Sequence, residues 1–310
     1  MGRPVRLTAA NEVASRLRGH YGAPLRREFV VRSERGEPTP LNRLMSSQGA
    51  AGGGRGGRQR LALLLTALWV CSKPPHSTKH SAGWWAEMIG LPEPRGQAAG
   101  RSVVANLREL DRRGFITLEA GRDGLLPKVS LRSELGTGEP YVRPHLDPYP
   151  SFIRVPETLW TRGLIGELDA RALAMYLLLI YYTNLDSRNE IWFSNTAFRE
   201  RHGMAEATRL NGLNTLVNLG VATMREDYVD AAHDVGYRTI KRRFYRLDPL
   251  YIPPATSKPD TEPKVSNTDI EPKPMNRWPE AVPEIDPWAS FPAGNQPTGA
   301  KHFDDETPIF

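Results

Sequence analysis

One segment of the chain, residues 98–113, combines a row of arginines with a separate row of apolar residues. Arg101, Arg108 and Arg112 fall at helical spacing on one side. The apolar residues that would face a core are Val103, Leu107 and Leu110. An arginine guanidinium can bond guanine through two parallel hydrogen bonds, and it can also clamp phosphate oxygens. The segment therefore predicts a helix that offers its arginines to a polyanion such as DNA.

A second segment, residues 204–219, repeats this layout with different polar chemistry. Its apolar residues are Leu210, Leu213, Leu216 and Val217. Its polar residues include asparagine, whose side-chain amide can pair with adenine through two hydrogen bonds. The residues that we expect to contact DNA here are Thr208, Arg209, Asn211 and Asn214. The sequence thus predicts two helices that each read base edges.

Further cations flank the two predicted helices. Beside the first helix, the expected DNA contacts are Arg95, Gln97, Arg122 and Lys128. Beside the second helix, they are Arg199, Arg201, Arg238, Lys241, Arg242 and Arg243. Cations at such positions can contact backbone phosphates, which add affinity but carry no sequence information. Charges on an exposed helix are also often only solvated, so a protein-interaction module stays open as an alternative.

These residues belong to two bodies, 59–135 and 151–252, that share one order of elements. In the first body we expect helices over 61–72, 81–91 and 98–113, and strands over 115–118 and 128–131. In the second body we expect helices over 169–183, 194–202 and 204–219, and strands over 190–193, 221–228 and 237–247. Three helices followed by a β-hairpin is the order of a winged helix, a form of helix-turn-helix domain. The predicted fold class is therefore mainly α with small β wings (α+β), with two tandem winged-helix domains.

The remaining segments read as tails and a linker. Residues 1–60 hold 12 arginines and 4 glutamates, and residues 1–58 are expected to form a basic, Arg/Gly-rich flexible arm. Residues 136–150 are rich in glycine and proline and are expected to be a linker. Residues 253–310 are proline-rich and acidic, which predicts a disordered tail. A basic head and an acidic tail suit a nucleic-acid-binding protein with an interaction tail.

The sequence offers little that could support catalysis. It has a single cysteine, Cys71, and its glycine-rich stretch lacks the Lys-Ser/Thr pair of a phosphate-binding loop. His76 and His80 lack a carboxylate or cysteine partner nearby, and Tyr181 and Tyr182 lie in an apolar segment. We therefore expect no enzyme activity, no metal and no cofactor. The absence of a long apolar run predicts a cytoplasmic protein that does not bind a membrane.

Two resemblances to known families follow from these features. The tandem plan over 59–250 resembles plasmid and phage replication initiators built from two winged helices, and it also resembles winged-helix transcription regulators. The terminus Asp304-Asp305-Glu306-Thr307-Pro308-Ile309-Phe310 resembles the acidic tip of bacterial single-stranded-DNA-binding proteins. That resemblance implies that Asp304, Asp305, Glu306, Ile309 and Phe310 bind a partner, with the ring in an apolar pocket and the carboxylates against cations. Ile309 departs from the family pattern, because it separates the proline from the terminal phenylalanine.

Together these observations predict a sequence-specific double-stranded-DNA-binding protein. The favoured role is a replication initiator of a plasmid or phage-like element, with host replication proteins as partners of the tail. A winged-helix transcription regulator is the alternative, and an interaction adaptor of the replication machinery is a further one. The sequence leaves the oligomeric state open.

Overall fold

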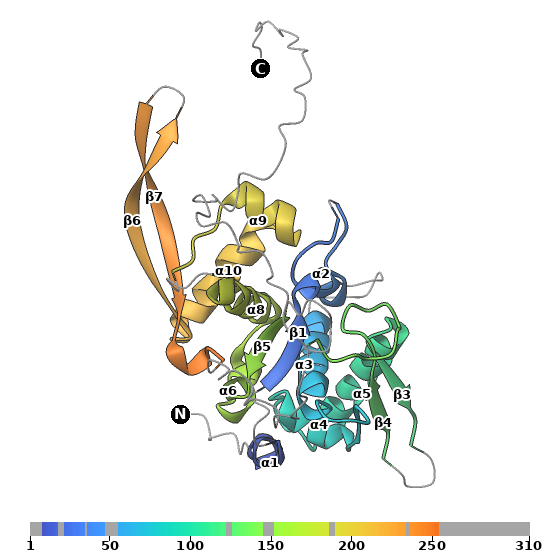
Figure 1. The fold of residues 1–310 in the computed structure, drawn as a ribbon. Coiled ribbons are helices and arrows are strands. Elements are labelled where there is room, and N and C mark those ends of the chain that lie inside the picture. The colour runs from blue at the N-terminus through green and yellow to red at the C-terminus, as the bar shows by residue number, and fades with distance from the viewer. Residues whose placement is uncertain are drawn as a thin grey trace, which may run out of the picture. The chain divides into compact units, whose positions relative to one another are not determined.

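The computed structural model describes residues 8–17, 22–34, 36–46, 55–121, 126–144, 152–185, 190–233 and 236–253. These residues form a mixed arrangement of helices and small antiparallel sheets, which confirms the α+β class (Figure 1). Residues 1–258 form one compact unit. Arg122 and the five tail residues, Asp304, Asp305, Glu306, Ile309 and Phe310, lie outside the described residues.

The first body contains the predicted helices and strands in the predicted order. They are α3 (Arg55–Val70), α4 (Ala82–Met88), α5 (Gln97–Arg112), β3 (Ile116–Glu119) and β4 (Lys128–Leu131), and a strand that was not predicted, β2 (Ser77–Lys79), lies between α3 and α4. The Ser81 hydroxyl accepts a hydrogen bond from the Trp84 amide at 3.2 Å and so begins α4. Gly114, at φ 76°, follows α5 as the expected left-handed residue. The three strands form one antiparallel sheet in the order β2-β4-β3.

The second body repeats this order. Its corresponding elements are α8 (Ala170–Leu185), α9 (Asn195–His202), α10 (Glu206–Asn218), β6 (Ala222–His233) and β7 (Gly236–Leu247). Ile191 forms a single antiparallel bridge with Tyr245 of β7, where β2 pairs with β4 in the first body. Ser194 precedes α9 as expected, but its side chain makes no capping hydrogen bond. The hairpin is longer than predicted, because β6 extends to His233 and β7 begins at Gly236, and the two strands pair over this whole length.

The N-terminal residues differ from the expected flexible arm. Residues 8–46 contain α1 (Thr8–Arg16), β1 (Gly22–Arg26), the 3₁₀ turn η1 (Arg27–Phe29) and α2 (Pro40–Met45). Val13, Phe29 and Leu41 are among their buried residues. The prediction of an arm is wrong for these residues, because their apolar side chains bury against the body and outweigh the many arginines.

The glycine-rich stretch before the first predicted helix is partly helical. Helix α3 begins at Arg55, six residues before the predicted start, and includes Gly56 and Gly57. A Cβ atom on Gly57 would lie 2.7 Å from the Met45 carbonyl oxygen, so glycine permits close contact between α3 and the end of α2. The glycines therefore serve packing here, although their composition suggested a linker.

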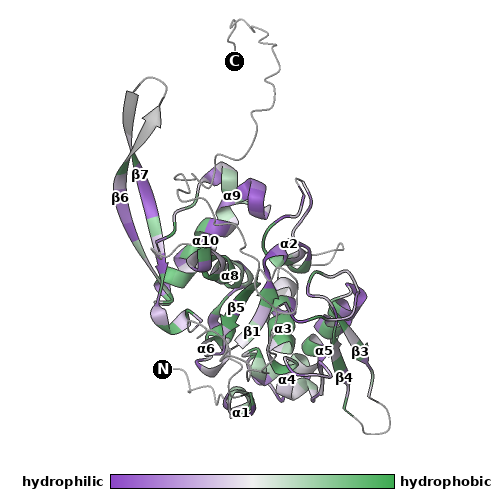
Figure 2. Ribbon diagram, in the orientation of Figure 1, coloured by the Kyte–Doolittle hydropathy of each residue, from purple (hydrophilic) through white to green (hydrophobic). Residues whose placement is uncertain are grey.

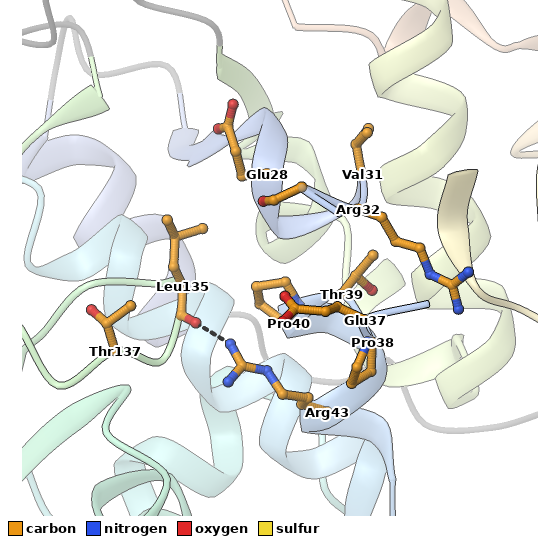
Figure 3. A pocket seen from close by; sticks show the side chains of 11 residues that line it. Glu28, Val31, Arg32, Glu37, Pro38, Thr39, Pro40, Arg43, Leu135 and Thr137 are labelled. Atoms are coloured by element: carbon orange, nitrogen blue, oxygen red, sulfur yellow. Dashed lines mark hydrogen bonds between the residues drawn. The ribbon is translucent and has the colours of Figure 1, made fainter. Parts of the chain in front are cut away.

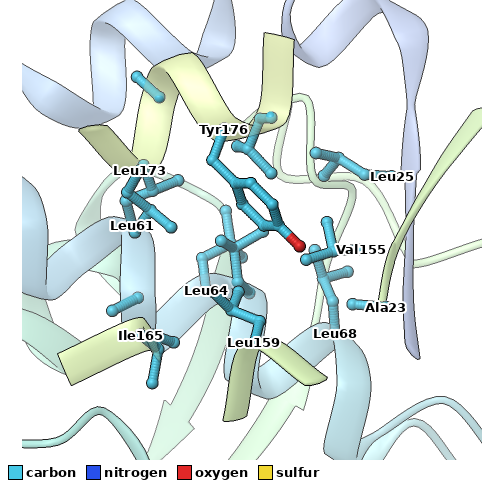
Figure 4. Packing of buried hydrophobic residues seen from close by; sticks show 14 of the residues in the cluster. Ala23, Leu25, Leu61, Leu64, Leu68, Val155, Leu159, Ile165, Leu173 and Tyr176 are labelled. Carbon is cyan, nitrogen blue, oxygen red and sulfur yellow. The ribbon is translucent and has the colours of Figure 1, made fainter. Parts of the chain in front are cut away.

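The two bodies share one hydrophobic core, with α3 packed against α8. Figure 4 shows Leu61 and Leu64 of α3 in the same cluster as Leu173 and Tyr176 of α8. Trp160 lies in α6 (Thr158–Thr161), a short helix that precedes α7 (Leu164–Glu167). Its indole ring stacks on Trp69 with centroids 4.5 Å apart, and its Nε1 donates to the Thr66 hydroxyl at 2.9 Å. Both tryptophans are buried, so aromatic side chains fill the junction between the two bodies.

Arg58 strengthens the same junction. Its guanidinium donates hydrogen bonds to four main-chain carbonyls at 2.7 to 3.2 Å, those of Ile89, Ile165, Gly166 and Leu168. Gly90 and Gly166 meet beside it, and a Cβ on Gly90 would lie 2.5 Å from the Gly166 Cα. Burial lowers the pKa of Arg58 below its ordinary value. Arg58 therefore contacts the first body at one carbonyl and the second body at three.

A two-stranded sheet and a short loop complete the connection. Strand β1 pairs antiparallel with β5 (Phe152–Pro156), so the N-terminal segment is joined to the second body. The part of the expected linker that the structure describes, residues 136–144, is packed against the first body, with Tyr141 buried. Next to it, the fully buried Glu134 pairs with Arg26 at 2.8 Å. The last described segment, the 3₁₀ turn η3 (Pro249–Tyr251), follows β7.

The N-terminal segment also completes the carboxyl end of α9. Arg32 donates from its amide to the Arg201 carbonyl at 2.9 Å, and Asn42 donates from Nδ2 to the His202 carbonyl at 2.6 Å. These bonds satisfy carbonyls that lack partners within the helix. The imidazole of His202 is fully buried, with Nδ1 2.7 Å from the Val30 carbonyl and Nε2 2.7 Å from the Tyr182 hydroxyl. Because a carbonyl only accepts, Nδ1 carries the proton and Tyr182 donates to Nε2.

The buried imidazole predicts a loss of stability in mild acid. Burial lowers the pKa of His202 from 6.5 to about 4. Between those two values the unfolded chain binds a proton that the folded chain does not, so the free energy of unfolding falls as the pH falls. The loss should reach about 3 kcal/mol near pH 4 and should not grow further below it. Denaturant unfolding at several pH values measures it.

A His202→Gln variant provides the comparison, because glutamine keeps a donor and an acceptor but cannot titrate. The difference in unfolding free energy between wild type and variant should shrink from pH 7 to pH 4. A constant difference over that range would mean that folding does not shift the pKa of His202.

Candidate nucleic-acid interface

The exposed side of α5 carries the arginines that the sequence placed there. Arg101, Arg108 and Arg112 are exposed, and so is Gln97 at the start of the helix. The apolar side is buried as predicted, and it comprises Val103, Leu107 and Leu110. Helix α5 packs on α3 and α4. Its polar stripe therefore faces away from the core that fixes it.

A buried polar contact fixes the orientation of α5. The Gln59 side-chain oxygen accepts hydrogen bonds from Asn106 Nδ2 at 2.7 Å and from the Ser102 hydroxyl at 2.5 Å. Asn106 is buried, and Gln59 belongs to α3. Because these bonds require a particular rotation of α5, they help to set the direction of the arginine stripe.

The three arginines of the stripe differ in how much charge they offer. Arg112 pairs with Glu109 at 2.6 Å, and the hydrogen bond from Arg112 lowers the pKa of Glu109 to about 2. Arg101 and Arg108 form no ion pair with another residue in the described part of the chain. These two guanidinium groups are therefore the ones most available to a ligand.

Cations around α5 extend this surface. Arg95 is exposed in the turn before the helix. Lys128 pairs with Glu119 at 2.8 Å, which reduces its free charge. Lys79, which sequence reasoning missed, is exposed at the end of β2, opposite Lys128 in the sheet. The pairing of β2 with β4 places it there, and the sequence carried no signal for that pairing.

The exposed side of α10 is polar and carries no basic residue, although Glu206 at its first position is exposed. Asn211 and Asn214 are exposed, as is Asn218, and Thr208 is half-buried. Helix α10 packs closely on α8, because Gly212 lies so near that a Cβ there would be 2.6 Å from the Arg171 carbonyl oxygen. That contact turns the asparagines outward. Their side-chain amides make no hydrogen bond with another described residue.

Arg209 is a wrong prediction as a DNA contact. Its side chain is buried, 4% exposed, and lies over the Phe198 ring at 5.2 Å. It bonds the Asn195 side-chain oxygen and lies 3.6 Å from Glu206. Burial lowers its pKa. A signal for this was present in the sequence, because Arg209 precedes the buried Leu213 by four residues and so shares its face.

The β6–β7 hairpin holds the densest cationic strand of the second body, but its own acids oppose it. Figure 2 shows hydrophilic residues along both strands. Lys241 and Arg243 both pair with Glu226, at 2.5 and 3.0 Å. Arg242 lies over the Trp192 ring at 3.9 Å. The side chain of Arg238 lies outside the described residues. The hairpin is therefore less cationic than the sequence of β7 alone suggested.

The cations predicted on α9 lie at its carboxyl end. Arg199 is exposed and Arg201 is half-buried. A cation there is favourably placed against the negative end of the helix dipole, whatever its ligand. Only Arg199 is fully presented to solvent, so it is the stronger candidate for a phosphate contact.

One cavity lies apart from these residues. It has a volume of about 300 Å³ and lies between the N-terminal segment and residues 135–137 (Figure 3). Its charged lining residues are Glu28, Arg32, Glu37 and Arg43. Arg43 is turned toward Leu135 and donates to its carbonyl oxygen. None of the predicted DNA contacts lines this cavity.

Within the described residues, no helix is long and apolar enough to cross a membrane, and no group of three or more metal-ligating side chains gathers. The main chemical feature of the described surface is thus the cationic stripe of α5 with the neutral polar stripe of α10. No protein-family model matches the chain, and no curated protein matches it, so its function must be inferred from the chemistry of these two helices.

Proposed function

We propose that this chain is a sequence-specific double-stranded-DNA-binding protein built on two winged-helix units. The order of elements supports this. Each body has a helix, a short strand or bridge, two further helices and a hairpin, and the early strand pairs with the last one. In this architecture the third helix lies in the major groove and the hairpin lies beside it. The third helices here are α5 and α10.

The observation that carries the proposal is the exposed arginine stripe of α5. Arg101 and Arg108 are exposed, seven residues apart on one face, and without an ion-pair partner among the described residues. A buried apolar face and the Gln59–Asn106 contact hold them in place. Because packing fixes the helix that carries them, these arginines can reach guanine edges without rearrangement of the main chain.

The surrounding cations would supply affinity without sequence choice. Arg95 and Lys79 lie beside α5, and Arg199 lies on α9. Each phosphate that such a cation neutralises releases counterions, which makes binding weaken as salt rises. The hairpin of the second body would contribute less to DNA affinity than its sequence suggests, because two of its cations form ion pairs with Glu226.

This leads to a prediction for Glu226→Gln. The change should strengthen duplex binding several-fold at low salt and steepen its salt dependence, because Lys241 and Arg243 become available to phosphates. Fluorescence anisotropy with a labelled duplex over a range of salt concentrations measures both effects. Glu139→Gln is the matched control. Glu139 is exposed, so this substitution removes the same negative charge but releases no paired cation. Equal gains in the two variants would show that only net charge matters.

Within this class we propose the role of replication initiator for a plasmid or phage-like element. The support is the C-terminal tip, which resembles the partner-binding tail of bacterial single-stranded-DNA-binding proteins. An initiator must bring host replication proteins to its site, and a tail that binds such a protein would serve that purpose.

Nuclease footprinting of the purified full chain on the DNA around its own gene tests the proposal. Protection of several direct repeats beside an AT-rich stretch supports the initiator. One short protected site over a promoter replaces the initiator with a transcription regulator. No protection at low salt, together with no salt-sensitive affinity for random duplex, overturns DNA binding and favours an adaptor that binds proteins.

A further inference from the structure

The two third helices differ in chemistry in a way that assigns each a different kind of base pair. On α5 the exposed polar residues are mainly arginines. On α10, Ala207, Asn211, Asn214 and Asn218 are exposed at spacings of four, three and four residues, which places them on one face. The only basic residue of α10 is Arg209, and it is buried. A DNA-facing α10 would thus make no cationic contact of its own.

Asparagine is an unexpected choice for an exposed helix face. It is a less favourable helix residue than alanine, lysine or glutamine, because its amide competes with the main chain for hydrogen bonds. The amides of Asn211, Asn214 and Asn218 gain no compensating bond from another described residue. A stripe of this kind is explained if the amides bond a ligand. In the major groove, asparagine matches the N6 and N7 atoms of adenine, and a small apolar side chain such as that of Ala207 suits the thymine methyl group.

The packing of the molecule holds α5 and α10 in one unit. Helix α5 is fixed on α3, and α10 is fixed on α8, while α3 and α8 pack on each other. The Trp69–Trp160 stack and the Arg58 hydrogen bonds join the bodies further. A change in the offset between the two helices would break these buried contacts.

We propose that a single copy of this protein reads an asymmetric DNA site with two blocks, in which α10 selects A·T pairs through its asparagines and α5 selects guanine through its arginines. This inference rests on the proposed DNA-binding function and adds the base composition of the site and the residues that read each block. The asparagine face would contribute base specificity alone. The arginine face would contribute base specificity and electrostatic affinity. The two blocks occur in one order and at one spacing.

Selection of bound duplexes from a random-sequence library with the full-length protein tests this directly. The expected result is one block that contains guanine and one block of A·T pairs, at a constant separation. Two identical blocks, or two blocks at variable separation, would overturn the proposal while leaving DNA binding intact. Failure to retain any duplex at low salt would overturn the proposed function itself, so the two failures are distinguishable.

Variants then assign each block to its helix. Asn211→Ala with Asn214→Ala should abolish selection of the A·T block, reduce affinity for the selected duplex about tenfold to a hundredfold, and leave the salt slope unchanged. Alanine favours helices, so this variant should fold at least as well as the wild type. Asn11→Ala, an exposed asparagine on α1, is the matched control and should change nothing. An unaltered A·T block in the double variant would overturn the assignment to α10.

Discussion

Replacing Arg101 and Arg108 together with alanine should lower affinity for the protein's duplex site by about 2 to 6 kcal/mol, since each side chain that reads a base contributes about 1 to 3 kcal/mol. Both side chains are exposed and lack an ion pair within the described residues, so their loss removes ligand contacts and spares the fold. The salt dependence of binding should also flatten if either arginine contacts a phosphate. Anisotropy titrations against specific and random duplexes at several salt concentrations measure both quantities.

Three single variants sharpen this comparison. Arg162→Ala removes an exposed arginine from the turn after α6 and should leave affinity almost unchanged. Arg112→Ala should lower duplex affinity less than Arg101→Ala does, because Arg112 is already paired with Glu109. If the double variant binds as tightly as the wild type while its melting temperature is unchanged, α5 does not contact DNA.

Replacing Trp160 with alanine should lower the free energy of unfolding by about 3 to 5 kcal/mol, the range for removing a large aromatic side chain from a core. Trp160 is 1% exposed, stacks on Trp69 and donates to the Thr66 hydroxyl. The change would leave a cavity at the junction of the two bodies and remove the hydrogen bond that the Thr66 hydroxyl accepts, although this hydroxyl still donates to the Ala62 carbonyl. Denaturant unfolding followed by circular dichroism measures the loss.

The shape of the transition carries as much information as its midpoint. In the wild type we expect one cooperative transition, because the two bodies share a core. Trp84→Ala is the control, since Trp84 is only half-buried and stacks on His80 outside the junction. That variant should lose less stability than Trp160→Ala. Two separate transitions in the wild type would mean that the bodies unfold independently and that the junction contributes little.

Local patterns in the sequence were sufficient for most helices and strands of the two bodies. The burial of Val103, Leu107 and Leu110 follows from their spacing alone, because a helix of 3.6 residues per turn places them on one face. Gly114 and Gly220 both adopt a positive φ after a helix, a conformation that glycine reaches without steric cost. Such features depend on residues within a few turns of one another.

The N-terminal segment shows where composition misleads. Its many arginines suggested a flexible arm, yet several of them bond main-chain carbonyls or carboxylates of distant segments, as Arg26 bonds Glu134 and Arg58 bonds Gly166. These partners lie more than one hundred residues away along the chain. No local pattern reports such a contact, because it forms only when the segments are brought together.

The sequence by itself determined the order of the main helices and hairpins of the two bodies, the arginines of α5 and the asparagines of α10, since each depends on residue type and helical spacing. Only the tertiary structure decided which charges stay available. It buried Arg209 among aromatic rings, paired Lys241 and Arg243 with Glu226, and joined the two bodies through Trp69 and Trp160. The physical reason is that the neighbouring segments decide whether a charge is paired or available and whether an apolar surface is buried or exposed. That packing is set by contacts between segments far apart in the chain.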